Sequence, residues 1–253
     1  MTKVDYSKIA SRYDNNPIRA EIPFDRTLDL SNNNAWRVVD LGCGTGLYIA
    51  SQQANPLRTN IQWIGVDPSP EMLEIARRKV SNVEFLNAAA ENLPFDNETI
   101  DYVVSRFSFQ HFSDQQRALR EIHRITRPGG YFKIVNLVPE LSPDWWVFKY
   151  FPQAIEIDKK RFWSINVQKN EVQAAGFTIA KEELHLREQV PADLIVNEAR
   201  NRETSELLLI DDDHYREGLA RLLRDLVPIG NGLVRWGLMI AEITYQRPPL
   251  PAY

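Results

Sequence analysis

The stretch from Val38 to Gly46, Val-Val-Asp-Leu-Gly-Cys-Gly-Thr-Gly, constrains the fold more than any other part of the chain. Apolar residues run without polar alternation up to Leu41, which is typical of a strand buried on both faces in a parallel sheet. Gly42, Gly44 and Gly46 follow at once, and glycine allows both positive φ angles and a close approach of backbone to a ligand. A short helix over 47–54 would present its free amides there. The stretch therefore predicts an α/β fold with a nucleotide-like ligand at the end of this strand.

The glycine spacing and the acid before it separate two kinds of ligand. The spacing is G-x-G-x-G, whereas the dinucleotide fingerprint is G-x-G-x-x-G. Asp40 stands two residues before the first glycine, where a carboxylate disfavours a pyrophosphate and favours an amino group or a positive charge. A strained turn without any ligand is the alternative, since glycine is the usual residue in such turns.

Length, charge and cysteine content exclude several other classes of protein. The chain has 253 residues, and we expect one α/β domain over 1–253. A net charge of −4 argues against a general nucleic-acid binder. Cys43 is the one cysteine, which excludes an internal disulfide and a multi-cysteine metal site, and we expect no metal. No apolar run approaches the ~20 residues of a membrane span, and the N-terminus lacks the apolar core of a signal peptide, so a cytoplasmic protein is expected.

Asp67 is the candidate ligand for a ribose. It ends a second predicted buried strand over 61–67, about 20 residues after the last glycine, where acids of nucleotide-binding folds accept bonds from ribose hydroxyls. A carboxylate has two acceptor oxygens for two hydroxyls. The alternative role for Asp67 is to cap a helix that starts around Pro68. Both the ribose contact and the helix start are possible if Ser69, rather than Asp67, is the cap. On the helix that follows, we expect Met72 in the core. Its alternative role is to contact an edge of the adenine.

Three motifs in order resemble class I S-adenosylmethionine-dependent methyltransferases of the small-molecule, quinone-biosynthesis-like type. They are the glycine loop, the segment Ala-Glu-Asn-Leu-Pro-Phe at 90–95 and Arg-Pro-Gly-Gly at 127–130. The resemblance is good over residues 5–138 and covers the remainder in outline. It implies a Rossmann-like, seven-stranded, doubly wound sheet whose last strand is antiparallel, with S-adenosyl-L-methionine as the methyl donor.

The resemblance also assigns cofactor contacts. Arg19 would meet the methionine carboxylate, although a solvated surface arginine is an equal alternative. Ala89 stands where relatives often carry an aspartate that binds adenine, so adenine recognition would rest on backbone groups and be weakened by ~1 kcal/mol. The remaining implied contacts are Tyr13, Pro68, Ala90, Glu91, Arg106 and His111.

His111 is the candidate catalytic residue. It follows a predicted strand over 100–105, and the carboxyl ends of strands carry the chemistry in doubly wound sheets. A histidine there could act as a general base or orient a substrate oxygen. The alternative is a structural role in the loop before the next helix. On that helix, a stripe of arginines that includes Arg124 is expected to be solvated.

Segments 139–176 and 190–232 are expected to be insertions that cover the substrate. The first is rich in aromatic residues, which suit an apolar or planar substrate. Packing of the insertion onto the body is the alternative for most of these rings. The acidic run from Asp211 to Asp213 before His214 invites a metal hypothesis, but a capping turn is the better interpretation. The expected substrate contacts are Trp145, Trp146, Tyr150 and Trp163.

Together these features predict methyl transfer to an O, N or C atom of a small apolar or planar molecule by direct displacement. Because the donor is already activated, alignment of the two partners is the main task, and no catalytic triad is needed. The alternatives are an S-adenosylmethionine-binding protein that does not methylate and a nicotinamide-dependent oxidoreductase. The sequence leaves monomer and homodimer open.

Overall fold

The computed structural model describes residue 4, residue 6 and residues 10–15, 22–31, 34–55 and 60–251. The chain divides into two compact units. The larger unit contains Tyr6–Asn136, Val167–Glu183 and Glu242–Tyr253, and the smaller one contains Leu137–Asn166 and Leu184–Ala241. The expected cover segment 139–176 is thus divided, since its part after residue 166 groups with the larger unit.

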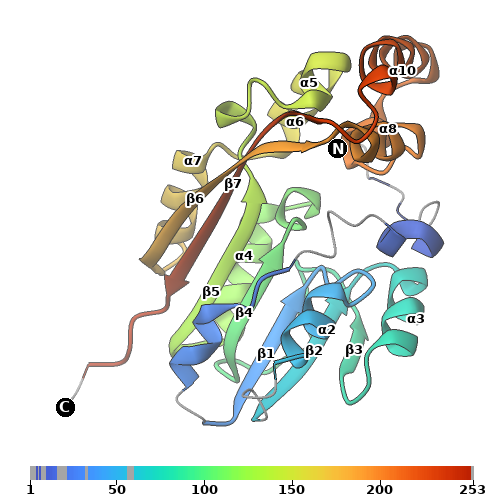
Figure 1. Cartoon of the computed structure of the whole chain (residues 1–253). Coiled ribbons are helices and arrows are strands. Elements are labelled where there is room, and N and C mark those ends of the chain that lie inside the picture. Colours follow the sequence, from blue (N-terminus) through green and yellow to red (C-terminus); the bar gives the residue numbers. More distant parts are fainter. Residues whose placement is uncertain are drawn as a thin grey trace. The chain divides into compact units, whose positions relative to one another are not determined.

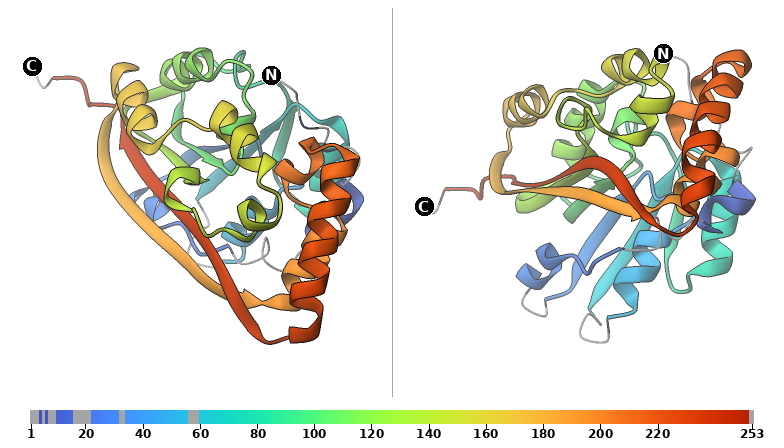
Figure 2. Two further views of the ribbon diagram at one scale, coloured as in Figure 1. Left: turned by 90° about the horizontal axis from the view of Figure 1, so that it is seen from above. Right: turned by 45° about the horizontal axis from the view of Figure 1, so that its top comes forward.

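Seven strands form one mixed sheet in the order β3-β2-β1-β4-β5-β7-β6 (Figure 1). β1 pairs in parallel with β2 and β4, β2 with β3, and β4 with β5, while the last strand is antiparallel. Figure 2 shows β6 and β7 side by side along their length. The predicted doubly wound architecture is confirmed. The strands are β1 Trp36–Leu41, β2 Ile61–Asp67, β3 Glu84–Asn87, β4 Ile100–Arg106, β5 Thr126–Leu137, β6 Thr178–Pro191 and β7 Leu233–Gln246.

Helices connect the strands, and Figure 1 shows α2 in front of the sheet and α4 behind it. The α-helices are α2 Leu47–Gln53, α3 Pro70–Lys79, α4 Gln115–Ile125, α5 Trp146–Tyr150, α6 Gln153–Arg161, α7 Ile165–Ala174, α8 Ala192–Arg200, α9 Ser205–Leu209 and α10 Asp212–Leu226. The short 3-10 helices are η2 Ala10–Asn15, η3 Arg26–Ser31, η4 Phe109–His111, η5 Pro139–Leu141 and η6 Val227–Ile229.

Side-chain caps fix where three helices begin, as the sequence indicates. Ser69 accepts from the amide of Met72 at 3.3 Å, and Asp114 caps α4. Asp211 caps α10 by accepting from the amide of His214 at 3.0 Å. Each cap satisfies one of the free amides of a first turn. The capping interpretation of Asp211 is therefore confirmed.

The strand β5 begins earlier than the sequence suggests. Proline followed by two glycines, as at residues 128–130, is typical of the end of a helix, but α4 ends at Ile125 and β5 starts at Thr126. Gly129 has a positive φ of 79° and donates its amide to the carbonyl of Arg247 on the neighbouring chain segment at 2.8 Å. Glycine permits this irregular strand start, which coincides with a register shift opposite Ile100 and Tyr102.

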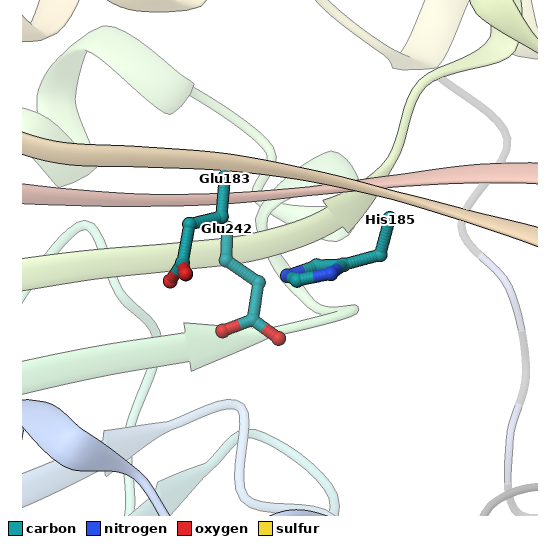
Figure 3. Close-up of side chains that lie close together, drawn as sticks. All are labelled: Glu183, His185 and Glu242. Atoms are coloured by element: carbon teal, nitrogen blue, oxygen red, sulfur yellow. The ribbon is translucent and has the colours of Figure 1, made fainter.

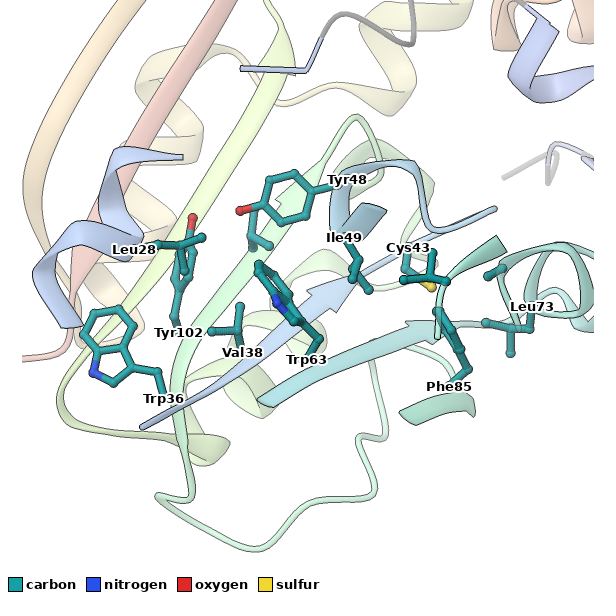
Figure 4. Close-up of a cluster of buried hydrophobic side chains, with 13 residues drawn as sticks. Leu28, Trp36, Val38, Cys43, Tyr48, Ile49, Trp63, Leu73, Phe85 and Tyr102 are labelled. Carbon is teal, nitrogen blue, oxygen red and sulfur yellow. The ribbon is translucent and has the colours of Figure 1, made fainter. Parts of the chain in front are cut away.

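The core of the larger unit lies where α2 and α3 pack on the sheet (Figure 4). Leu73 and Ala76 of α3 are fully buried there, as their helical spacing predicts. Val38 of β1 is also fully buried, which agrees with a strand covered on both faces. The rest of the cluster comprises Leu28, Trp36, Cys43, Tyr48, Ile49, Trp63, Val80, Phe85, Tyr102 and Val104.

A buried charge network attaches the segment around Asp25 to this core. Lys133 of β5 pairs with Asp25 at 3.1 Å and with Glu242 at 2.9 Å. The hydroxyls of Tyr48 and Tyr102 donate to Asp25 at 2.8 and 2.6 Å. Burial acts to raise the pKa of Asp25, but Lys133 and these donors together lower it below its usual value. Asp25 is thus held as an ionised, fully bonded carboxylate.

Glu183 of β6 lies beside Glu242 of β7, with carboxylate oxygens within 4.8 Å of one another (Figure 3). His185 follows two residues later on β6, and such a group of side chains could hold a cation. Glu242 already pairs with the ammonium group of Lys133. The lysine therefore supplies a positive charge at this position.

In the smaller unit, two buried acids share one arginine. Asp158 of α6 is fully buried and Glu206 of α9 is 2% exposed. Arg161 lies 3.4 Å from Asp158 and 3.5 Å from Glu206, and it donates to the hydroxyl of Ser205 at 2.8 Å. One guanidinium cannot neutralise two buried carboxylates. Burial and the charge of Glu206 raise the pKa of Asp158 to about 9, against the opposing effect of Arg161.

We expect the thermal stability of the protein to fall as pH rises from 6 to 9. The folded protein keeps the proton of Asp158 up to a pKa of about 9, whereas the unfolded chain loses it near the ordinary value of 3.8. The unfolded state thus binds fewer protons over this window, so the contribution of Asp158 to stability is present at pH 6 and is lost toward pH 9. Asp158→Asn should remove most of this slope in a series of Tm measurements. Glu156→Gln, an exposed change on the same helix, should leave the slope as in the wild type; equal slopes in all three proteins would contradict the prediction.

Candidate active site

The loop after β1 adopts the backbone that its glycines predict. Gly42, Gly44 and Gly46 have φ angles of 77°, 52° and 75°. A Cβ atom at Gly42 would lie 2.4 Å from that of Ser108, so no other residue fits. A Cβ atom at Gly44 would meet no protein atom within 4 Å. The loop therefore has one side packed against the protein and an open position at Gly44, where a ligand can approach the backbone.

Asp67 is oriented by two backbone amides. Its carboxylate accepts from the amide of Gly44 at 2.9 Å and from that of Ser69 at 2.9 Å. The side chain of Asn87, at the end of β3, donates to the backbone carbonyl of Asp67 at 3.1 Å. A carboxylate has two acceptor oxygens, and this chemistry suits the two hydroxyls of a ribose.

Asp40 is the buried acid of the site. It is 2% exposed, and its Oδ2 atom has no hydrogen-bond partner. Burial and the charge of Asp67 raise the pKa of Asp40 to about 8, and Arg106 opposes the rise. A buried polar atom without a partner is uncommon in a native protein and costs free energy. A positively charged group at this position would supply the missing partner.

These features fit S-adenosylmethionine. Its sulfonium and ammonium groups are positive, which suits the unpaired oxygen of Asp40, and its ribose hydroxyls suit the oriented carboxylate of Asp67. A pyrophosphate would instead add negative charge beside two acids. The electrostatics of the site therefore disfavour a nicotinamide dinucleotide.

Glu121 and Arg124 of α4, which we call the Arg124 clamp, bind the backbone of the loop after β3. Glu121 accepts from the amide of Leu93 at 2.8 Å, and Arg124 donates to the carbonyls of Leu93 and Phe95 at 2.9 and 2.6 Å. Arg124 also pairs with Glu121 at 2.8 Å. The expectation that Arg124 is simply solvated is wrong, because its guanidinium donates to carbonyl or carboxylate groups of Leu93, Phe95, Asn97 and Glu121. Nearby, Glu91 accepts from the amide of Asp114 at 3.0 Å, and Ala90 is buried.

The N-terminal segment contacts the glycine loop through Asp14. The hydroxyl of Thr45 donates to Asp14 at 2.5 Å, and Lys79 of α3 pairs with the same carboxylate. The ring of Tyr13 lies 6.0 Å from that of Tyr6 in an edge arrangement. Arg19 lies outside the described residues, so its expected contact stays a prediction.

His111 lies just after β4 in a network of side chains. Its Nε2 atom is 2.9 Å from the hydroxyl of Tyr6 and 3.1 Å from the amide nitrogen of Gln110. Gln110 in turn accepts from Asn136 at 2.9 Å. Phe107, at the start of this loop, has a positive φ of 51°, which is unfavourable for a bulky side chain. Strained backbone of this kind often marks functional sites.

The other predicted contacts lie in different settings. Met72 of α3 is 3% exposed and belongs to the buried core. Pro68 is exposed, and Arg106 lies over the ring of Phe107 at 5.1 Å. The expected substrate contacts Trp145, Trp146 and Tyr150 belong to the smaller unit and are buried, and Trp163 is half-buried.

Several residues that shape the site were not identified from the sequence. Ser108 donates to the carbonyl of Leu41 at 2.7 Å and thereby joins the ends of β1 and β4. Tyr6 and Asn136 complete the network of His111. Asn87 could have been identified from the sequence. A polar residue at the end of a predicted strand indicates a position at the same edge of the sheet as Asp67. The partners of His111 lie far away along the chain and leave no such signal.

Comparison with known proteins identifies the family. The family model of the methyltransferase domain matches residues 39–134. A demethylmenaquinone methyltransferase of Chlorobaculum tepidum is 32% identical over 172 residues, which cover 51% of this chain and 69% of that protein. A demethylmenaquinone methyltransferase of Thermus thermophilus is 30% identical over 211 residues, which cover 70% of this chain and 93% of that protein. The crystal structure of a putative methyltransferase from an antibiotic biosynthesis pathway of Anabaena variabilis has a TM-score of 0.64 at 22% identity, covering 88% of this chain and 98% of that one.

The fold and the site define an S-adenosylmethionine-dependent methyltransferase of class I. More specifically, the chain belongs to the quinone-biosynthesis type of that family, with the demethylmenaquinone methyltransferases as curated relatives. It is therefore an enzyme that transfers a methyl group from S-adenosylmethionine to a small molecule. Within the part of the chain that the structure describes, no helix is long and apolar enough to cross a membrane.

Proposed function

We propose that the enzyme methylates a ring carbon of a small quinol-type molecule and that His111 is the general base. The relatives support the acceptor, since their names describe demethylmenaquinone methylation and C-methylation in ubiquinone and menaquinone biosynthesis. The observation that supports the base is the position of the His111 Nε2 atom, 2.9 Å from the hydroxyl of Tyr6 at the carboxyl end of β4.

Carbon methylation of a quinol needs a base. When bound, S-adenosylmethionine supplies a methyl group that is already activated on sulfur. His111 would take the proton of a ring hydroxyl, which makes the adjacent ring carbon nucleophilic. Methyl transfer from the sulfur of the cofactor would then place the methyl group on this carbon, and release of the ring-carbon proton to water would restore the aromatic ring. Neutral imidazole is suited to this role because its ordinary pKa lies close to 6.5.

For the cofactor we propose the following contacts. Asp67 accepts from the ribose hydroxyls, and Asp40 faces the positive part of the ligand. Ala90 and Glu91 hold the adenine through their backbone, with the Arg124 clamp fixing their loop. Tyr13, Arg19, Pro68, Met72 and Arg106 complete the predicted set.

The test of the base is His111→Ala with a demethylated naphthoquinol as the acceptor. We expect kcat to fall by about 10²–10⁴-fold, the usual contribution of a general base. Calorimetric titration with S-adenosylhomocysteine should show cofactor binding close to that of the wild type. His185→Ala, an exposed histidine on β6, is the matched control and should leave kcat unchanged.

Two results would contradict the proposal. Methylation at an oxygen or nitrogen atom, established by mass spectrometry and NMR of the product, would exclude carbon as the acceptor atom. A His111→Ala enzyme with wild-type kcat would show that His111 is not the general base and has a structural role in its loop.

A further inference from the structure

The side chain of Gln110, in the short helix η4, is buried and hydrogen-bonded on both sides of its amide. It is 5% exposed. Its Nε2 atom donates to the carbonyl of Phe107 at 3.0 Å and lies 3.1 Å from the Nε2 atom of His111, and its Oε1 atom accepts from Asn136 at 2.9 Å. All four residues belong to the larger unit. A glutamine amide has two N–H donors, so one serves Phe107 and the other is directed at His111.

The carbonyl of Phe107 decides which way this amide faces. The oxygen and nitrogen of an amide are assigned from their partners, and a backbone carbonyl can only accept a hydrogen bond. The backbone of Phe107 is itself held in place, because its amide donates to the carbonyl of Val135 at 2.8 Å. The opposite orientation of Gln110 would place its Oε1 atom against the Phe107 oxygen and its N–H groups against those of Asn136. The nitrogen of Gln110 therefore faces His111.

This orientation favours one position for the proton on the ring of His111. Neutral imidazole has one N–H donor and one acceptor nitrogen. Because Gln110 presents an N–H group to Nε2, a proton on Nε2 would place two donors against each other at 3.1 Å. The hydroxyl of Tyr6, 2.9 Å from the same nitrogen, can donate or accept and adapts to either form. Gln110 thus favours the tautomer of His111 that carries its proton on Nδ1.

We propose that Gln110 is a positioning residue that keeps the Nε2 atom of His111 unprotonated. The hydrogen bond made by one ring nitrogen of a histidine determines which nitrogen carries the proton. Asn136 and the carbonyl of Phe107 hold the amide of Gln110, and this amide in turn selects the tautomer of the histidine.

The catalytic part of this inference rests on the proposed function, in which Nε2 receives the proton of a ring hydroxyl. The unprotonated nitrogen of neutral imidazole is the one with a lone pair for that proton. Without Gln110, the proton of His111 would be distributed over both nitrogens, and molecules with the proton on Nε2 would not act as the base. The tautomer itself can be measured without any reaction.

The test uses nitrogen-15 NMR of the ligand-free protein at pH 8, with Gln110→Met as the variant that keeps the side-chain length and removes the amide. Ring nitrogens with and without a proton differ widely in chemical shift, and His111→Ala identifies the signals of His111 among the four histidines. In the wild type we expect the proton on Nδ1. In Gln110→Met, the ratio of the Nδ1-protonated form to the Nε2-protonated form should fall about fivefold to tenfold, the effect of one lost hydrogen bond.

Gln115→Met is the matched control. Gln115 is also buried, and it donates to the carbonyl of Phe109, in the same short helix as His111, at 3.1 Å. Its substitution should lower Tm by about 2–4 °C through the lost hydrogen bond and leave the NMR signals of His111 as in the wild type. The inference is overturned if wild-type His111 carries its proton on Nε2, if Gln110→Met leaves the ratio unchanged, or if Gln115→Met changes the ratio equally.

Kinetics separate this inference from the proposed function. Gln110→Met should lower kcat about fivefold, with unchanged binding of S-adenosylhomocysteine, and should have no further effect on kcat in the His111→Ala protein. An equal loss of kcat in both backgrounds would overturn the positioning role. If His111→Ala has wild-type kcat, the proposed base is refuted, whereas a proton on Nδ1 that depends on Gln110 would still support the inferred tautomer.

Discussion

Asp67→Ala is expected to abolish measurable binding of S-adenosylhomocysteine. Each hydrogen bond from a ribose hydroxyl to the ionised carboxylate contributes ~1.5–3 kcal/mol, so losing two weakens binding by about 100-fold or more. The change also removes the acceptor for the amides of Gly44 and Ser69, which frees the glycine loop. Isothermal titration calorimetry at pH 8 measures the effect, with Tm recorded to show that the variant is folded.

Two further variants sharpen this experiment. Asp67→Asn keeps one acceptor oxygen and should bind with an intermediate affinity. Glu74→Gln removes an exposed acid of α3 that pairs with Arg78, and it should bind as the wild type does. A folded Asp67→Ala protein with wild-type affinity would refute the assignment of the ribose to this carboxylate.

Binding of S-adenosylmethionine is expected to strengthen as pH rises from 6 to 8. Burial and the charge of Asp67 raise the pKa of Asp40 to about 8. Below that value the free protein holds Asp40 as a neutral acid, whereas a positively charged ligand favours the carboxylate. Binding must then displace a proton, so the affinity should increase by up to about tenfold per pH unit and level off above pH 8.

Calorimetry in two buffers of different ionisation enthalpy measures the displaced proton. Close to one proton should be released per ligand at pH 7 in the wild type, and none from this group in Asp40→Asn. S-adenosylhomocysteine keeps the ammonium group and lacks the sulfonium charge. A smaller proton release with this compound would therefore indicate that Asp40 faces the sulfonium. Equal, buffer-independent heats in wild type and Asp40→Asn would exclude the proton displacement.

Agreement between sequence and structure is close where the determining interactions are local. Short-range rules of backbone freedom, capping and apolar periodicity predict three features correctly. These are the strand–loop–helix around Gly42, the helix caps Ser69 and Asp211, and the end of a strand at Asp67. The early start of β5 shows where such local rules fail. Glycines after a helix usually end it, but here a tertiary pairing with Arg247 places Gly129 inside a strand.

The sequence alone determined the α/β class, the ligand loop and the acid at its entrance, because each depends on residues that are neighbours along the chain. The tertiary structure decided how those residues behave. It left an oxygen of Asp40 buried and unpaired, used Arg124 to clamp the loop after β3, and brought Tyr6 to His111. These outcomes depend on which distant groups meet and on how far water is excluded around them. Burial and long-range pairing set charge and hydrogen bonding, and neither is encoded in the spacing of a motif.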